Sequence, residues 1–334
     1  MAILAGDIGG TKTILALFSE EKGMPLIREE TFASRRYPDF GEVLQEFMKK
    51  EKAPPKGASF GVAGPVLNGR CETTNLPWIV DAGRIARRFA IPSVALLNDL
   101  EATAYGTLVL TERDYFVLSA GAPERLVSET AARGNRAIIA AGTGLGEGIL
   151  FWNGSRYQPS ASEGGHADFA PRNPVQVSLL EFLWKKYPAV SYERILSGPG
   201  LFNVYQFFKE TGDGEEPPWL SRRLAEEDPA AVVSEAALGG KVDLCVKALD
   251  LFVSVYGAEA GNLALKALAT GGIDVGGGIA PKILEKLREG TFMKAFIEKG
   301  RFASFMSGIP VRVILNEKTG LLGAAYYASL HLKI

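Results

Sequence analysis

The hydrophobic pattern of the first hundred residues alternates between short apolar runs and amphipathic stretches. The apolar runs typical of buried strands lie at residues 3–8, 13–18, 59–63 and 93–97. Helical signals fall between and after them, at residues 40–50, 82–89 and 99–107. Strands and helices that alternate in this way are typical of an α/β layer structure. We therefore predict a small α/β domain over residues 1–107.

A second α/β unit begins at residue 108 and contains helical insertions. Helices are predicted at residues 179–186 and over the Ala- and Leu-rich residues 241–268, with an exposed, proline-bearing loop at residues 211–218. Because 334 residues exceed what one hydrophobic core usually organises, two domains are expected. The larger of them spans residues 108–315.

A glycine-rich turn near the N-terminus places Asp7 between two apolar strands. Glycines let backbone N–H groups approach phosphate oxygens, and the carboxylate can hold a phosphate-bound magnesium ion, directly or through water. The spacing matches neither the P-loop nor the dinucleotide-binding motif. A plain tight hairpin is the alternative. The candidate phosphate-binding residues are Gly6, Asp7, Ile8, Gly9, Gly10 and Thr11.

Two further glycine clusters follow. Residues 137–151 repeat the strand–turn–strand pattern with Gly142, Thr143 and Gly144 in the turn, so two turns, one in each half of the chain, could clamp a polyphosphate. Residues 271–282 follow a helical run and carry Gly276, Gly277 and Gly278 at a strand end, which leaves space for a flat ring against the backbone. Close packing of a helix on a sheet is the alternative for this third cluster.

Asn98 and Asp99 lie where a predicted strand enters a helix. Either residue could simply cap that helix. The pair also fits phosphoryl transfer to an alcohol, which needs a carboxylate to accept the hydroxyl proton and an amide to orient the hydroxyl.

A second polar set surrounds the segment Glu163-Gly-Gly-His166. Its carboxylate and imidazole suit polyol recognition, because each sugar hydroxyl both donates and accepts a hydrogen bond. A structural histidine and a surface glutamate are the alternatives. Glu193, which precedes the segment Ser197-Gly-Pro, is the third candidate of this polar set. The alternative for Glu193 is a charge on a helix surface, with Ser197-Gly-Pro as the stop of that helix.

Together the three glycine segments resemble the ATP-binding elements of the sugar kinase, actin and chaperone superfamily. Within it, the chain resembles the bacterial-type glucokinases nearly from end to end. Seven motifs in the family's order carry the resemblance: Gly6-Asp-Ile-Gly-Gly-Thr11, Thr74-Asn-Leu-Pro-Trp78, Leu97-Asn-Asp-Leu100, Ala141-Gly-Thr-Gly-Leu-Gly146, Glu163-Gly-Gly-His-Ala-Asp-Phe-Ala-Pro171, Glu193-Arg-Ile-Leu-Ser-Gly-Pro-Gly200 and Gly320-Leu-Leu-Gly323.

The resemblance implies two RNase H-like α/β domains flanking an interdomain cleft, the actin-like ATPase fold. A final helix from about residue 319 would return to the first domain, which residues 316–334 then complete. The implied activity is transfer of phosphate from ATP to the 6-hydroxyl of glucose, with Mg²⁺ as cofactor. Asp99 would be the base and Asn98 a sugar contact, while the rest of the hexose site would be Glu163, His166 and Glu193.

The sequence leaves some alternatives open. Mannose, an amino sugar or a polyphosphate donor is not excluded. A sugar-sensing regulator usually carries an N-terminal DNA-binding segment, whereas here the phosphate turn begins at residue 6. An actin-like assembly ATPase needs no sugar base, so the Asn98–Asp99 and Glu163/His166 sets argue against it.

Composition narrows the choice of partners. The 37 basic and 38 acidic residues give no charge excess that would attract nucleic acid or an anionic membrane. We found neither a signal peptide nor an apolar run near the roughly 18 residues of a membrane span, and we expect a cytoplasmic homodimer. Cys71 and Cys245 are far apart and predict buried thiols. The related ROK sugar kinases carry a zinc site of one histidine and a cysteine cluster; this chain lacks that cluster, so His166 is interpreted as a sugar contact.

Overall fold

The computed structural model divides the chain into two compact units. Unit 1 comprises the residues up to 113 together with those from 316 onward, and unit 2 comprises residues 114–315. The division expected from the sequence lies after residues 107 and 315. All residues are described except 1, 22, 74, 123–133, 213 and 332–334, so Thr74 of the second motif and the end of the predicted last helix lie outside the described residues.

Unit 1 is built on a mixed five-stranded sheet in the order β3-β2-β1-β4-β8. Strands β1, β2 and β3 pair antiparallel, whereas β1, β4 and β8 are parallel. The strands span Ala2–Ile8 (β1), Lys12–Ser19 (β2), Leu26–Ala33 (β3), Gly57–Val62 (β4) and Val94–Asn98 (β8). A small second sheet contains Val66–Leu67 (β5), Arg70–Glu72 (β6) and Ile79–Asp81 (β7).

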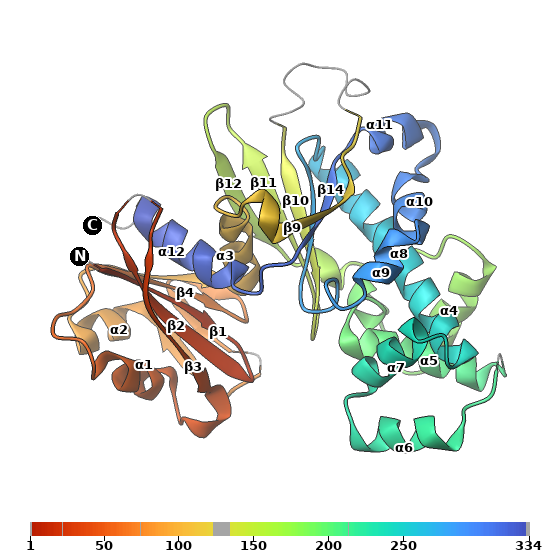
Figure 1. Ribbon diagram of the computed structural model, residues 1–334, viewed down its shortest axis with the longest axis horizontal. Helices are drawn as coiled ribbons and strands as arrows, with labels where there is room; N and C mark the ends of the chain where they lie inside the picture. Colours follow the sequence, from red (N-terminus) through yellow and green to blue (C-terminus); the bar gives the residue numbers. More distant parts are fainter. Residues whose placement is uncertain (1, 22, 74, 123–133, 213, 332–334) are drawn as a thin grey trace. The chain divides into compact units, whose positions relative to one another are not determined.

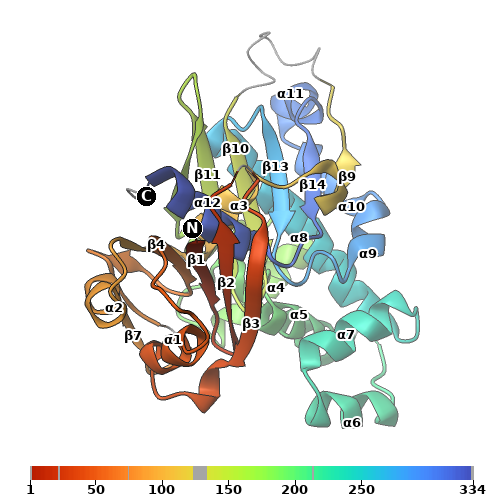
Figure 2. The ribbon, with the colours of Figure 1, turned by 60° about the vertical axis from the view of Figure 1, so that its left-hand side comes forward.

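Helices cover both faces of the unit 1 sheet, as Figures 1 and 2 show. Leu4 and Leu15 pack with Phe40 and Phe47 of α1, whereas Ala16 and its neighbours on the other face pack against α12. This explains why β1 and β2 are apolar on both faces rather than alternating. The helices are Phe40–Met48 (α1), Ala82–Phe89 (α2), Asp99–Gly106 (α3) and Thr319–His331 (α12).

Unit 2 contains a six-stranded sheet in the order β12-β11-β10-β13-β14-β9. Strands β10, β13 and β14 are parallel, and the remaining pairings are antiparallel. The strands span Tyr115–Ser119 (β9), Arg136–Ala141 (β10), Leu145–Trp152 (β11), Tyr157–Ser162 (β12), Gly272–Gly276 (β13) and Val311–Ile314 (β14).

The sheet of unit 2 packs against the long helix α8, which contacts β10 and β13 (Figure 1). The helices are Pro174–Trp184 (α4), Gly198–Glu210 (α5), Pro218–Glu226 (α6), Pro229–Leu238 (α7), Asp243–Ala267 (α8), Leu284–Arg288 (α9), Thr291–Ile297 (α10) and Ala303–Ser307 (α11). Two short 3₁₀ helices, Gly164–His166 (η5) and Tyr192–Arg194 (η6), carry predicted site residues.

The two sheets repeat one arrangement. Counted from β1 in unit 1 and from β10 in unit 2, five strands follow the same order, 3-2-1-4-5, and unit 2 adds β9 at the edge. Each copy begins with an antiparallel hairpin and continues with parallel strands. The RNase H-like α/β class predicted for both domains is therefore confirmed.

Most predicted elements are present, with two corrections. The segment Ser197-Gly-Pro does not stop a helix; it starts α5, because the Ser197 hydroxyl accepts a hydrogen bond from Gly200 N at 3.0 Å and Pro199 suits the first helical turn. The helix predicted at residues 179–186 begins earlier, at Pro174, behind an Asn173 cap. The long helix over 241–268 is confirmed as α8.

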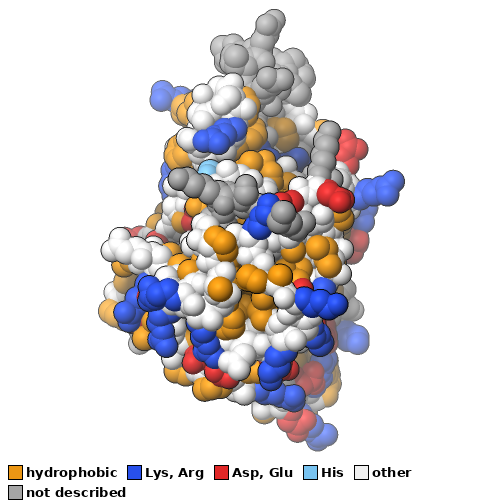
Figure 3. Space-filling model, turned by 90° about the vertical axis from the view of Figure 1, so that its left-hand side faces the viewer, with side chains coloured by type: hydrophobic (Ala, Val, Ile, Leu, Met, Phe, Trp, Pro, Cys, Tyr) orange, Lys and Arg blue, Asp and Glu red, His pale blue; other side chains and the backbone are white. Residues whose placement is uncertain are grey.

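The side of the molecule drawn in Figure 3 shows no single charged patch. Basic side chains lie on it in several separate groups among acidic and apolar ones. In the described part of the chain, no helix is long and apolar enough to cross a membrane.

Candidate active site

The first glycine turn joins β1 to β2 and is held from outside the hairpin. The Ser34 hydroxyl donates to Gly9 O at 2.8 Å, and Gly9 N donates to Lys12 O at 3.0 Å. Neither Gly9 nor Gly10 has a positive φ, so turn geometry alone does not require glycine there. At Gly10 the reason is space, because a Cβ would lie 2.6 Å from Asn75 Cβ. Sequence reasoning missed Ser34, which lies 25 residues from Gly9 and in no motif.

Asp7 is half-buried near the end of β1, two residues before Gly9. Burial raises the pKa of its carboxyl to about 6; the charge of Asp99 acts in the same direction, and Lys12 opposes it. Among the described residues, its carboxylate has no hydrogen bond or ion pair. A divalent cation would relieve the repulsion of the Asp7 carboxylate by Asp99, and carboxylate oxygen is a ligand that Mg²⁺ prefers.

Asn98 ends β8 and caps α3. Its side-chain oxygen accepts from Leu100 N at 2.9 Å and from Glu101 N at 3.4 Å, while its amide nitrogen donates to Gly64 O at 3.2 Å. The capping interpretation is therefore confirmed for Asn98. Only one N–H of the amide is left for a ligand, so Asn98 can act on a sugar as a donor and not as an acceptor.

Asp99 is the first residue of α3 and is exposed. One of its carboxylate oxygens accepts from Leu100 N at 2.9 Å. The N-terminus of a helix favours a negative charge, so its partial positive charge and this hydrogen bond hold the carboxylate in place. The geometry leaves Asp99 accessible to a hydroxyl.

The second glycine turn joins β10 to β11 in unit 2. Gly142 N donates to Gly144 O at 2.8 Å, and Gly198 N donates to Gly142 O at 2.8 Å. A Cβ on Gly142 would meet nothing within 4 Å, so open space lies against this backbone. Thr143 at the tip of the turn is exposed. The arrangement presents bare backbone where a phosphate could approach.

Glu193 lies directly against this second turn. Its Oε2 accepts from Leu145 N at 3.0 Å, and a Cβ on Gly144 would run into the same oxygen. The carboxylate is only 25% exposed. The interpretation of Glu193 as a charge on a helix surface is therefore wrong.

Glu163, His166 and Glu193 converge in unit 2. His166 Nε2 lies 3.9 Å from a Glu163 carboxylate oxygen, and His166 Nδ1 lies 4.0 Å from Glu193 Oε1. Both separations are longer than a hydrogen bond. The side chains of His166 and Glu163 are 60% and 74% exposed, so His166 is not a buried structural histidine. The three groups form an open polar cluster with hydrogen-bonding capacity to spare.

The third glycine cluster lies beside the second turn. Gly277 has φ +82° and its Cβ would lie 2.8 Å from Ala141 N, so close backbone packing explains this glycine. Ile279 N donates to Ala141 O at 3.2 Å, which joins the two segments. Gly278 is different, because a Cβ there would meet nothing within 4 Å. The packing alternative thus applies to Gly277, and open space for a flat ring lies at Gly278.

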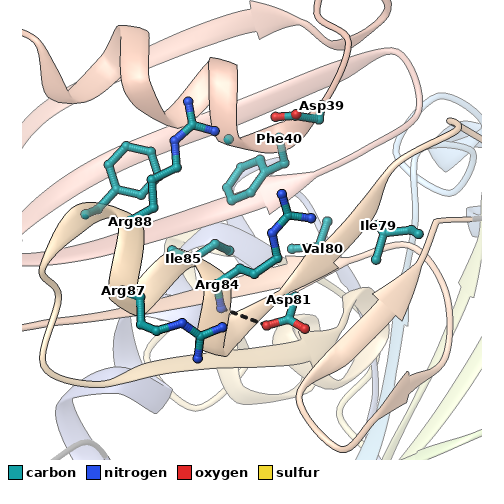
Figure 4. Close-up of a pocket in the computed structure, with 11 residues that line it drawn as sticks. Asp39, Phe40, Ile79, Val80, Asp81, Arg84, Ile85, Arg87 and Arg88 are labelled. Atoms are coloured by element: carbon teal, nitrogen blue, oxygen red, sulfur yellow. Dashed lines mark hydrogen bonds between the residues drawn. The ribbon is translucent and has the colours of Figure 1, made fainter.

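A pocket of about 420 Å³ elsewhere in unit 1 contains none of these residues. Figure 4 shows that it lies between α1, β7 and α2, with arginines along its rim. Arg88 is held there by Glu42 at 2.7 Å, and Asp39 and Asp81 cap the two helices. These charges cap the two helices and join one to the other, and we assign the pocket no role.

Among the residues described, no three His, Cys, Asp or Glu side chains form a cluster that could hold a metal ion by themselves. Cys71 and Cys245 are both buried free thiols, as predicted.

A family model described as Glucokinase matches residues 4–331 of the chain. The chain belongs to the glucokinase family. A glucokinase from Nostoc sp. is 43% identical to it over 98% of both chains. The kinase activity predicted from the motifs is thereby confirmed: glucokinases phosphorylate glucose with ATP.

Solved glucokinases share the fold. The crystal structure of a glucokinase from an Antarctic psychrotroph has a TM-score of 0.82 and 28% identity, and covers 97% of this chain and 98% of its own. A glucokinase from Balamuthia mandrillaris, solved in complex with glucose, has a TM-score of 0.80 over 98% of this chain and 93% of its own; at 22% identity it supports the fold alone. The predicted actin-like ATPase fold of the glucokinase family is confirmed.

Proposed function

We propose that this member of the glucokinase family transfers the γ-phosphoryl group of ATP to the 6-hydroxyl of glucose, with Asp99 as the general base. The observation that supports this most is the position of Asp99. It is an exposed carboxylate, held at a helix N-terminus and close enough to Asp7 of the first glycine turn to raise its pKa. The base therefore lies next to the turn proposed to hold phosphate.

The sugar contacts are assigned by their remaining hydrogen-bonding capacity. Glu193 uses Oε2 for Leu145 N, so Oε1 faces the ligand together with His166 and Glu163. Asn98 contributes its free N–H to the hydroxyl that reacts, because its oxygen caps α3. A sugar hydroxyl can donate to the two carboxylates and accept from the amide and the imidazole.

The nucleotide contacts are assigned to the three glycine segments. Gly9, Gly10 and Thr11 in unit 1 and Gly142, Thr143 and Gly144 in unit 2 would contact phosphates, and the space at Gly278 would take the adenosine. Asp7 would hold Mg²⁺, directly or through water. When bound, the ion would neutralise charge on the triphosphate.

In the reaction, Asp99 accepts the proton of the 6-hydroxyl as that oxygen attacks the γ-phosphorus, and ADP leaves. Asn98 orients the attacking hydroxyl, and Glu163, His166 and Glu193 fix the ring. Positioning and charge stabilisation carry most of the catalysis in phosphoryl transfer, so the protein needs to supply few covalent steps.

A coupled assay across hexoses and phosphoryl donors tests the proposed function. Glucose with ATP is expected to give the highest kcat/KM. A higher value for mannose, for an amino sugar or with polyphosphate would contradict the assignment. The homodimer and the cytoplasmic location stay predictions; sedimentation velocity and fractionation of cells check them.

Replacing Gly278 with alanine is expected to raise the KM for ATP about tenfold, the effect of one extra methyl group in an occupied space. The melting temperature should stay unchanged, because the new Cβ meets no protein atom within 4 Å. Gly277→Ala is the matched control: its strained φ and the clash with Ala141 should lower the melting temperature. An unchanged KM for ATP in Gly278→Ala would remove adenosine from this position.

Activity is expected to require Mg²⁺ with ATP and no structural zinc, because the chain lacks a cysteine cluster and Asp7 offers oxygen alone. Metal analysis of purified protein should find zinc well below one ion per chain. A zinc-specific chelator should leave the rate unchanged while Mg²⁺ is supplied. Stoichiometric zinc whose removal abolishes activity would contradict this expectation and reopen His166 as a candidate metal ligand.

A further inference from the structure

Two buried carboxylates in unit 2 belong to none of the sets described so far. Glu147 on β11 is 1% exposed, and Glu259 on α8 is 0% exposed. Acidic side chains are almost never fully buried unless they are paired. Glu147 lies within a glycine-rich hairpin and Glu259 within a long helix. Neither residue belongs to one of the motifs that indicated the candidate site.

The two carboxylates differ in their hydrogen-bond partners. Glu259 accepts from Lys266 Nζ at 3.2 Å and from Asn262 Nδ2 at 2.7 Å. Glu147 Oε1 has no hydrogen-bond partner among the described residues. Burial raises the pKa of Glu147 to about 7; the charge of Glu259 and a side-chain hydrogen bond between the two carboxyls act in the same direction, and Lys266 opposes them. A buried carboxyl without a cation of its own is most stable as the neutral acid.

The other titratable groups around the pair do not supply that cation. Burial, together with the charge of Glu259, raises the pKa of the Tyr192 hydroxyl. Burial also raises the pKa of the Tyr256 hydroxyl. Lys299 donates to Asn262 Oδ1 at 2.5 Å and to Ala258 O at 2.7 Å. Burial and the charge of Arg172 lower its pKa to about 8. Lys299 therefore donates to the neighbours of Glu259 on α8 and not to Glu147.

Glu147 lies directly under the segment that carries Glu163 and His166. It stands opposite Ser162 in the β11–β12 pairing, and Ser162 Oγ accepts from Gly164 N at 2.9 Å. A Cβ on Gly164 would run into Glu147 Oε2 and lie 3.0 Å from its carboxyl carbon. The backbone between the two sugar-site candidates thus rests on the Glu147 carboxyl.

Glu259 reaches the other sugar-site segment through Asn262. Asn262 Nδ2 donates to Glu259 and also lies 3.1 Å from the hydroxyl of Tyr192, the residue before Glu193. The acidic pair therefore contacts η5 on one side and is linked to η6 on the other.

We propose that Glu147 and Glu259 share one proton and that, in this state, the pair positions the 163–166 and 192–194 segments for sugar binding. Glu147 is a positioning residue, because it touches Gly164 and not the reacting atoms. Loss of the proton places two negative charges in one buried space, and the repulsion acts on the backbone of Gly164. The proposal rests on the assignment of Glu163, His166 and Glu193 as sugar contacts.

The predicted pH dependence has a definite sign. A carboxyl with a raised pKa keeps its proton at low pH and loses it as the pH rises through about 7. Sugar affinity is therefore highest below that pH and falls above it. The KM for glucose should rise with pH by roughly fivefold or more, the lower range of coupling between linked sites, whereas the KM for ATP should not follow it.

Kinetics of four full-length proteins over about pH 6 to 9 test the proposal, since this range spans the transition. In Glu147→Gln, which cannot titrate, the rise in glucose KM should disappear. In Lys266→Gln, the loss of a cation beside Glu259 should move the rise to higher pH. The exposed Glu226→Gln is the matched control and should follow the unmodified protein. A Glu147→Gln profile identical to that of the unmodified protein would overturn the proposal.

Two measurements keep the test decisive. Infrared difference spectroscopy should show a protonated buried carboxyl at low pH that is absent in Glu147→Gln; its absence from the unmodified protein would overturn the shared proton even if Glu147→Gln does not fold. Glu163→Ala separates the two assignments. If Glu163→Ala leaves the glucose KM unchanged, the sugar site itself is misplaced, whereas a raised KM together with an unaltered Glu147→Gln profile rejects the acidic pair alone.

Discussion

Replacing Asp99 with asparagine is expected to lower kcat at least roughly a hundredfold, the scale on which loss of a general base acts. Asparagine keeps the size of the side chain and can still accept the hydrogen bond from Leu100 N. It cannot take the proton of the attacking hydroxyl. The KM for glucose should therefore stay within a few-fold, and steady-state kinetics of both substrates would measure the effect.

Asp81→Asn is the matched control for this variant. Asp81 is also an aspartate at the start of a helix in unit 1, where its carboxylate accepts from Arg84 N at 2.8 Å. Asparagine caps helices as well as aspartate does, so kcat should not change. A near-normal kcat would exclude Asp99 as the base.

Replacing Glu193 with alanine is expected to raise the KM for glucose by roughly a hundredfold, because charge-assisted hydrogen bonds are worth about 1.5–3 kcal/mol each. The KM for ATP should rise much less, through loss of the acceptor for Leu145 N in the second glycine turn. Glu193→Gln keeps an acceptor for that N–H and so separates the two effects. Kinetics at saturating concentration of the other substrate would measure each KM.

Glu163→Ala should change the KM for glucose in the same direction without touching the KM for ATP, because the exposed Glu163 side chain holds no part of the turn. Glu226→Gln, an exposed substitution on α6, controls for general effects of removing a glutamate. A glucose KM that is insensitive to both Glu163→Ala and Glu193→Ala would mean that the sugar binds elsewhere.

Strands β1, β2 and β4 could be predicted because almost all of their side chains are buried, whereas the short β14 is also buried and was not predicted. The β1–β2 and β10–β11 hairpins are mostly apolar, so their pattern was clear, and their similarity predicted two versions of one hairpin. β3 was not predicted, because it is an edge strand that carries Arg28, Glu29 and Glu30 in its middle. Charges of this kind are tolerated at an edge and give no hydrophobic signal. Arg28 and Lys50 neutralise Glu30 there at 2.8 and 2.7 Å.

For the candidate site as well, residues within local motifs could be predicted, whereas residues that act through contacts distant in sequence could not. Motifs made Asp7, Asp99 and Glu193 candidates for the site, and the resemblance to the family suggested the roles of Asp99 and Glu193. The sequence could not separate the capping role of Asn98 from a ligand role, since both need a polar residue at the start of a helix. Ser34 and Glu147 act through contacts with Gly9 and Gly164 that only the folded chain creates, and nothing in their own neighbourhoods indicates it.

The hydrogen bond from Leu145 N to Glu193 joins the second glycine turn, which we propose binds the nucleotide, to a carboxylate that we propose binds glucose. Such a shared contact makes the two binding equilibria dependent on each other, and thermodynamic linkage requires the dependence to be mutual. If a bound sugar tightens the hold on nucleotide by some factor, bound nucleotide must tighten the hold on sugar by the same factor. An enzyme that meets abundant ATP would then take up glucose at lower concentrations than its empty form could.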